Sequence, residues 1–264
     1  MANASRVVYV VISSILTLNS LLAVLIAILA GIAHQNLYLL QVDTTGLYLS
    51  DSILADFSGL CKPIPAGFPT RNLFNGIAGT CLATRSPDIT ATDIGIHPLY
   101  DVNLWGYCYT PRNGSRVCST PALDWAELAL NTTKSTLEDW VGAAGQSISL
   151  HESVETDIHE FGLFTRFAEV FSVVAALALA VALLFGVFAT RSRVVSCVAF
   201  LAAAVATVAV CIAAISSALM AVGATAVFKY GAQADVTWCI LALPVGAVLA
   251  LAASVFWLLT CCAP

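Results

Sequence analysis

Residues 99–118 read LYDVNLWGYCYTPRNGSRVC and contain the most specific pattern in this chain of 264 residues. Trp105, Gly106 and Tyr107 precede Cys108, and a second cysteine, Cys118, follows after nine further residues. Aromatic side chains beside a disulfide suit a strand that packs at a membrane surface. We therefore expect a small disulfide-bonded β-structure here, whose residues stabilise the fold rather than react.

The cysteines around this motif indicate two disulfides. Four of the nine cysteines lie in the long polar region of the chain, at Cys61, Cys81, Cys108 and Cys118. An even number of cysteines in an oxidising compartment indicates a disulfide framework, and four cysteines allow three pairings. Residues 111–114, PRNG, are strong turn formers, which favours Cys108 with Cys118 as a hairpin pair. Cys61 with Cys81 then follows by elimination.

Outside this region, four apolar stretches are long enough to cross a bilayer, which needs about 20 helical residues. The chain is 59% hydrophobic and 10% charged, whereas a soluble domain has roughly 25% charged residues. The first stretch is about twice as long as the core of a signal peptide, so we expect an uncleaved anchor. The predicted fold is an all-α bundle of four transmembrane helices with a small extracellular β-containing domain. The expected spans are residues 7–33, 166–190, 194–227 and 236–262, with outer loops 34–165 and 228–235 and inner segments 1–6, 191–193 and 263–264.

The charge distribution predicts the orientation. Arg6, Arg191 and Arg193 flank the spans on one side, in stretches without Asp or Glu, whereas residues 34–165 hold fourteen Asp and Glu and six Lys and Arg. Lys and Arg in short flanks mark the cytosolic side of a membrane protein. We therefore expect cytosolic termini, an extracellular long loop, and no cytosolic tail after the fourth span.

The composition of the spans predicts how they pack. The third span has 34 residues and would reach roughly 50 Å as a helix, against a bilayer core of about 30 Å. Either the helix tilts strongly, or its outer end projects from the membrane and packs on the long loop. We expect projection, because Ser216, Ser217 and Gly223 cluster in the outer half. Abundant Ala, Gly and Ser predict a tight bundle, because small residues let helices approach closely. The polar residues of the first span, Ser13, Ser14, Thr17, Asn19 and Ser20, are expected to form hydrogen bonds between helices.

Several residues are candidate modification sites. Asn113 and Asn131 begin N-glycosylation sequons in the loop expected outside. Cys261 and Cys262 lie at the inner end of the fourth span, where they are either S-palmitoylated or plain thiols at the membrane edge. The remaining cysteines of the spans, Cys197, Cys211 and Cys239, are expected only to pack.

One set of residues could bind a metal. His151, Glu155 and His159 recur every four residues and would share one face of a helix, where they could bind zinc. A solvated acidic helix face is the simpler interpretation, so no metal or other cofactor is expected. The spacing is not HExxH, and the chain contains no GxSxG or glycine-rich phosphate loop, so no enzyme is predicted. The few scattered basic residues disfavour nucleic-acid binding.

The Trp105 to Cys118 element, in the first outer loop of a four-span chain, resembles the claudin-like superfamily. More narrowly, LWGYC at residues 104–108 with a long outer loop is similar to the fungal SUR/PalI family of plasma-membrane tetraspans. This resemblance implies that Cys108 and Cys118 lie on a small outer β-sheet above a four-helix bundle, and that Trp105 anchors the sheet to the membrane. It also implies roles in plasma-membrane domains called eisosomes, in cell-wall integrity, or in sensing ambient pH.

Our functional hypothesis is a non-enzymatic protein that organises domains of the fungal plasma membrane. Its expected partners are membrane lipids, other membrane proteins or further copies of itself, and cell-wall polymers. The alternative is an auxiliary subunit that binds a channel, transporter or wall-synthesis enzyme, or a component of a pH-sensing pathway. A transporter is disfavoured because no charged residue lies near the centre of a span.

Overall fold

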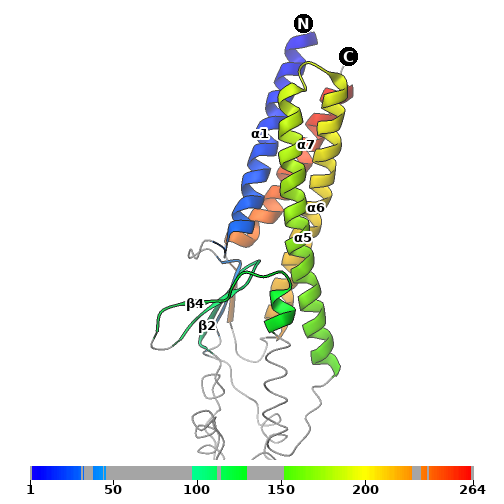
Figure 1. The fold of residues 1–264 in the computed structure, drawn as a ribbon. Coiled ribbons are helices and arrows are strands. Elements are labelled where there is room, and N and C mark those ends of the chain that lie inside the picture. The colour runs from blue at the N-terminus through cyan, green and yellow to red at the C-terminus, as the bar shows by residue number, and fades with distance from the viewer. Residues whose placement is uncertain are drawn as a thin grey trace, which may run out of the picture.

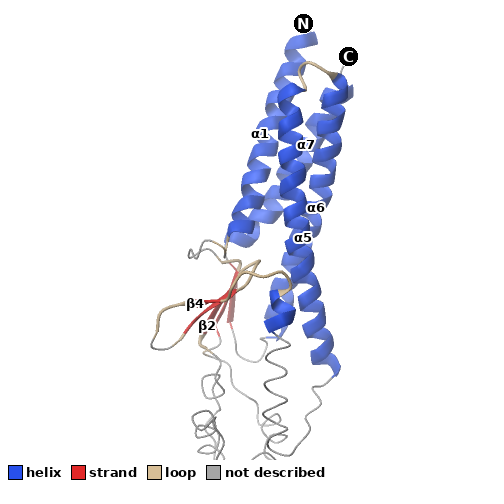
Figure 2. Cartoon of the chain, viewed as in Figure 1, coloured by secondary structure: helices blue, strands red, loops and turns tan. Residues whose placement is uncertain are grey.

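The structure, a computed structural model, describes residues 2–30, 32, 38–43, 45, 97–111, 114–129, 152–227, 233–236 and 238–262. Four long helices run side by side, and a small sheet lies at one end of the bundle (Figure 1, Figure 2). Both ends of the chain lie at the opposite end of the bundle (Figure 1). We call these two ends the sheet end and the terminal end.

The four helices are α1 (Ala2–Leu29), α5 (Glu152–Phe188), α6 (Arg193–Val227) and α7 (Trp238–Cys262). Each contains a stretch apolar and long enough to cross a membrane, which confirms a multi-pass membrane protein. Two helices are longer than a membrane requires. α5 begins inside the range expected to be loop, and the outer part of α6 places Met220 against Leu39 and Leu104. The expectation that the third span packs on the outer region is thereby confirmed.

The bundle is tightly packed because its interior is built from small residues. α1 lies against α5 and α7, and α6 lies against α5 and α7. Buried alanines line these contacts, and the large Trp257 of α7 fits beside Gly186 of α5. Polar groups of α1 reach α7, because Ser20 Oγ donates to Gly246 O at 2.8 Å and Trp257 Nε1 donates to Thr17 Oγ1 at 3.1 Å. These bonds confirm the expected interhelical hydrogen bonds for Thr17 and Ser20, whereas Ser13 Oγ donates to Tyr9 O within α1 itself.

The sheet has five antiparallel strands in the order β4-β3-β2-β1-β5. Four strands come from the long region between α1 and α5, and β5 comes from the short connection between α6 and α7. The strands are β1 (Leu40–Asp43), β2 (Leu99–Val102), β3 (Tyr107–Thr110), β4 (Val117–Cys118) and β5 (Gln233–Val236). β1 pairs with both β2 and β5, so the sheet joins segments from both halves of the chain.

The two faces of the sheet differ in chemistry because successive residues of a strand point to opposite sides. Leu40 and Val42 are buried on one face, where Tyr100 and Val102 pack against them. On the other face, Asp101 is buried beside the cysteine pair. Its carboxylate accepts a hydrogen bond from Gln41 Nε2 at 2.8 Å and forms an ion pair with Arg116 Nη2 at 2.8 Å.

Candidate functional site

The tight connection between β2 and β3 brings the sheet against the bundle. Asn103 N donates to Gly106 O at 2.8 Å, which closes a turn over residues 103–106. Leu104 at this turn is fully buried, in a cluster with Leu39, Ala168 and Met220. The turn is therefore the point at which the sheet enters the apolar end of the bundle.

Two indole groups hold this turn in place. Trp105 Nε1 donates to Ile28 O in the last turn of α1 at 2.9 Å, where helix carbonyls lack partners within the helix. Trp125 is buried, and its Nε1 donates to Leu104 O at 2.9 Å. We call Trp105 and Trp125, together with the two carbonyls that they bind, the tryptophan latch. Trp105 thus anchors the sheet to α1, whereas its expected anchoring to the membrane stays a prediction. The role of Trp125 was not expected.

Gly106 is required by the close approach of Ser119, the residue that follows β4. A Cβ atom at this position would lie 2.5 Å from Ser119 Oγ. That hydroxyl is itself held, because it accepts a hydrogen bond from Tyr107 N at 3.0 Å. Residues 105–107 therefore lead from the β2–β3 turn into β3, and the fit of Gly106 against Ser119 holds this connection in place.

Aromatic rings form a row along one face of β2 and β3. Tyr100, Tyr107 and Tyr109 lie with ring centroids 6.3–6.5 Å apart, and His97 stacks on Tyr109 at 4.1 Å. Trp125 continues the row, 5.8 Å from Tyr107. Burial raises the pKa of the Tyr100 phenol, which the hydrogen bond from His97 N partly opposes. The row thus connects the latch to the distal part of the sheet.

A buried carboxylate lies where the latch meets α5. Glu169 is fully buried, and its Oε2 accepts a hydrogen bond from Asp124 N at 3.4 Å. Its Oε1 has no hydrogen-bond partner among the residues that the structure describes. Asp124 has a positive φ of 60° and forms a more exposed ion pair with Arg166 at 3.2 Å. A buried carboxyl oxygen without a hydrogen bond lowers the stability of the folded state, so Glu169 destabilises the contact between Asp124 and α5.

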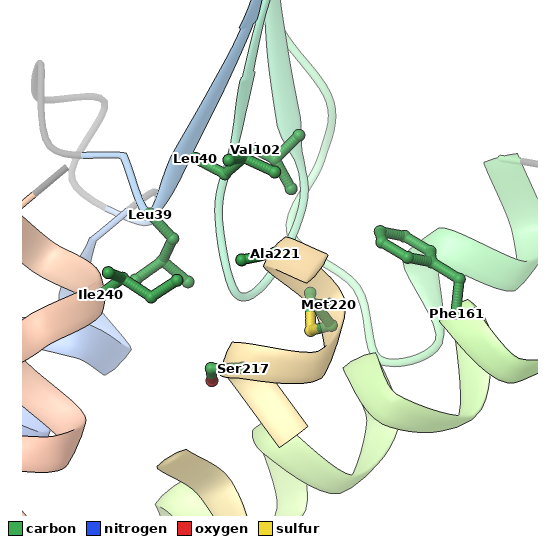
Figure 3. Close-up of a pocket in the computed structure, with 8 residues that line it drawn as sticks. All are labelled: Leu39, Leu40, Val102, Phe161, Ser217, Met220, Ala221 and Ile240. Atoms are coloured by element: carbon green, nitrogen blue, oxygen red, sulfur yellow. The ribbon is translucent and has the colours of Figure 1, made fainter. Parts of the chain in front are cut away.

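A small apolar pocket lies where the sheet region meets the helices (Figure 3). Residues of the sheet region, α5, α6 and α7 line it, and only one of them is polar. Without a titratable lining residue, the pocket has no group for acid–base chemistry. Its lining residues are Leu39, Leu40, Val102, Phe161, Ser217, Met220, Ala221 and Ile240.

The predicted hairpin disulfide is present. Cys108 and Cys118 face each other in register on β3 and β4 and are bonded, with their Cα atoms 3.9 Å apart. Cys61 and Cys81 lie outside the described residues, so their pairing stays a prediction. The same applies to the sequons at Asn113 and Asn131, which also lie outside that part of the chain.

The structure corrects two expectations for the terminal end. Cys197 was expected only to pack and Cys261 to be a candidate palmitoylation site, but their sulfurs are bonded to each other. The Cα atoms lie 5.1 Å apart, within the usual range for a disulfide. Cys197 is near the start of α6 and Cys261 near the end of α7, and these two helix ends lie on the same side of the bundle. The positions of the two cysteines in their spans could therefore have indicated the pair. Cys262 is a free and exposed thiol, so its palmitoylation stays a prediction.

The metal prediction is not tested. His151 lies outside the described residues, as does the side chain of Glu155, and His159 is exposed on α5. Among the residues that are described, no group of three His, Cys, Asp or Glu could hold a metal ion.

Four membrane-spanning helices with a disulfide-bonded antiparallel sheet latched to one end define a tetraspan membrane protein with a structured domain outside the bilayer. The model of the SUR7/PalI family matches residues 9–257, nearly the whole chain. The chain therefore belongs to the SUR7/PalI family, as its LWGYC motif suggested. No curated protein and no solved structure matched it.

Proposed function

We propose that this protein is a non-enzymatic organiser of plasma-membrane domains that supports the integrity of the cell surface or cell wall. The observation that carries the proposal is the tryptophan latch. Trp105 and Trp125 fix the sheet to α1 and to the hairpin turn, so the outer domain keeps one position relative to the bundle. A fixed outer surface suits a protein that acts by packing beside its neighbours.

The filled interior of the bundle also supports this role. Leu179, Val210, Leu243 and Trp257 are fully buried at the core. The described helices instead expose large apolar side chains on their outer faces, such as Leu184 of α5 at 65%. These faces are suited to lipid and to lateral contact with further copies of the chain. The outer loop is the region we assign to contact with cell-wall polymers.

The proposed orientation places both termini in the cytosol and the sheet outside the cell. It rests on Arg6, Arg191 and Arg193 at the terminal end. In this orientation Asn113 and Asn131 are accessible to glycosylation, and Cys262 is accessible to cytosolic palmitoylation. A glycosidase-sensitive mass shift that disappears in the Asn113→Gln/Asn131→Gln double variant supports the orientation. Protection of the sheet and exposure of the termini to protease added to intact cells contradict it.

Imaging of the tagged full chain at its native expression level tests the proposed function. We expect stable patches at the cell surface with slow exchange after photobleaching. Trp105→Ala should produce patches that exchange faster, because the outer domain is no longer fixed, whereas Phe188→Ala at the terminal end should not. A uniformly diffuse or internal distribution of the wild-type chain contradicts the proposal.

A second candidate function is that of an auxiliary subunit for a channel, transporter or wall-synthesis enzyme. It is favoured by Leu123 and Leu128, which are 61% and 66% exposed beside Trp125, outside the four candidate spans. Mild-detergent purification separates the two functions. A stoichiometric larger partner that the wild-type chain retains and the Leu123→Ser/Leu128→Ser variant loses supports the auxiliary role, and recovery of a self-oligomer alone supports the first.

A further inference from the structure

The disulfide between Cys197 and Cys261 joins two membrane helices at the terminal end. Cys197 lies in the first turns of α6, and Cys261 is the penultimate residue of α7. The bond thus links residues 64 positions apart in the sequence. Both residues are half-buried and lie near the ends of their membrane spans.

The two disulfides of the described structure lie at opposite ends of the bundle. Cys108–Cys118 is in the sheet, whereas Cys197–Cys261 is beside the chain termini (Figure 1). α6 alone has 35 residues and spans roughly 50 Å, which exceeds the thickness of the bilayer core. The two bonds therefore face different compartments. Whichever way the chain is inserted in the cell surface, one disulfide faces the cytosol, where thiols are kept reduced.

The charge distribution identifies that disulfide. Arg6, Arg191 and Arg193 lie at the terminal end, which marks it as the cytosolic side. Arg6 is also part of the structure there, because its guanidinium donates to Ala189 O at 3.0 Å and to Ser196 Oγ at 3.3 Å. α1 is thereby tied to the α5–α6 connection next to Cys197. Cys197 and Cys261 are thus held close to each other on the cytosolic side, where reduction of their disulfide is favoured.

We infer that Cys197 and Cys261 form a reversible dithiol–disulfide site that exchanges with the glutathione pool. In the oxidising direction, one cysteine thiolate attacks glutathione disulfide and releases one glutathione thiolate. The second cysteine thiolate then attacks the protein sulfur of the mixed disulfide and releases the second. The two protons of the cysteine thiols end on the two glutathione molecules, the protein pair is oxidised, and glutathione disulfide is reduced.

The two states differ in how the terminal end is held. In the oxidised state α6 and α7 are covalently joined there, and Cys262 beside the bond is an exposed thiol. In the reduced state Cys261 becomes a second thiol beside it. The link between α6 and α7 then depends on packing alone, whereas the hydrogen bonds of Arg6 still hold α1 to the α5–α6 connection. The site therefore controls one helix contact without changing the sheet end.

The test uses the full chain in open native membranes, equilibrated with reduced and oxidised glutathione at a series of ratios. After an acid quench, free thiols are labelled in denaturant with a polymer-linked maleimide, and the adducts are counted by gel mobility. We expect a step of two adducts in the wild-type chain. Cys197→Ser and Cys261→Ser should abolish that step, and the matched controls Cys211→Ser and Cys262→Ser should retain it.

A second measurement needs no variant and so does not depend on variant folding. Trypsin cleavage after Arg193 and Lys229 places Cys197 in peptide 194–229 and Cys261 in peptide 230–264. We expect these peptides to be cross-linked after treatment with glutathione disulfide and separate after treatment with reduced glutathione. A cross-link that never forms, or one that persists in reduced glutathione, overturns the inference. Because the sheet disulfide Cys108–Cys118 can give a two-adduct step of its own in every chain, the inference is also overturned if Cys197→Ser and Cys261→Ser show as many two-adduct steps as the wild-type chain.

The inference rests on the proposed orientation but not on the proposed role in membrane domains. Labelling of intact cells with a membrane-impermeant maleimide reports the orientation separately. If Cys262 is labelled from outside, the orientation is wrong and the cysteine pair faces the oxidising side, which overturns the inference. The role in membrane domains is tested by imaging and the cysteine exchange by thiol labelling. Failure of one proposal therefore does not affect the test of the other.

Discussion

Replacing Trp105 tests whether the tryptophan latch holds the outer domain on the bundle. Trp105→Ala removes the hydrogen bond to Ile28 O and the packing of the indole against the cluster around Leu104. Truncation of a core tryptophan costs about 3–5 kcal/mol, and because Trp105 is half-buried we expect the lower end, about 3 kcal/mol. Trp105→Phe keeps an aromatic ring but loses the donor, which costs about 1 kcal/mol.

Thermal unfolding of the full chain in lipid nanodiscs provides the assay. A stability change of 1 kcal/mol shifts the midpoint by about 2–4 °C in proteins of comparable size. Trp105→Ala should therefore lower the midpoint by about 6–12 °C and Trp105→Phe by about 2–4 °C. Phe188→Ala is the control, because Phe188 is 54% exposed on α5 and lies at the terminal end. A midpoint for Trp105→Ala no lower than that of the control refutes the latch.

Three further changes test other parts of the fold by the same unfolding assay. Replacing both Cys108 and Cys118 by serine opens a loop of 10 residues and should cost about 3 kcal/mol, with the largest loss in the sheet. Gly186→Ala should cost about 1–3 kcal/mol, because the new Cβ would lie 2.8 Å from the buried ring of Trp257. The pKa of Tyr100 is higher in the folded than in the unfolded chain. The neutral phenol therefore stabilises the fold below about pH 10, and this contribution is lost as the pH rises through the raised pKa. The midpoint of the wild-type chain should therefore fall more steeply above about pH 10 than that of Tyr100→Phe.

Each of these changes has an internal control. Reduction also opens Cys197–Cys261, so the wild-type chain and the Cys108→Ser/Cys118→Ser variant should have equal stability when both are reduced and differ when both are oxidised. Equal stability under both conditions contradicts a structural role for the Cys108–Cys118 bond. Gly246→Ala should be tolerated, because its Cβ would meet its nearest neighbour at an ordinary 3.5 Å. Equal stability of Gly186→Ala and Gly246→Ala contradicts the tight contact. Parallel pH profiles for the wild-type chain and Tyr100→Phe contradict the assigned role of the phenol.

The helices and one hairpin could be predicted because their signals are local. Membrane spans follow from long apolar stretches, and the PRNG turn brings Cys108 and Cys118 together across a short loop. β1 and β5 had no comparable signal, because each has four residues and pairs with strands distant in the sequence. The length of α6 predicted either a strong tilt or contact with the outer region, and the small and polar residues of its outer half favoured contact.

The candidate site was predictable only in part for the same reason. The aromatic and cysteine spacing around Trp105 identified an anchor, but its partner is the backbone carbonyl of Ile28, and a carbonyl carries no sequence signature. Trp125 and Glu169 become part of the junction through the docking of residues 121–129 on α5, which is a tertiary contact. The bond from Cys197 to Cys261 depends on the rotation of two helices about their axes, which hydropathy does not specify.

The pairing of β1 with β5 has a mechanical consequence for the bundle. β1 is the element that follows α1 along the chain, and β5 is the strand in the connection from α6 to α7. Their ladder therefore joins the outer ends of helices from both halves of the chain. A change in tilt of α1 relative to α7 would have to slide these two strands past each other and break their register. The ladder therefore resists separation of α1 from α7 at the sheet end. At the terminal end the Cys197–Cys261 bond joins α6 to α7, and the contact of α1 with α7 depends on packing and hydrogen bonds alone.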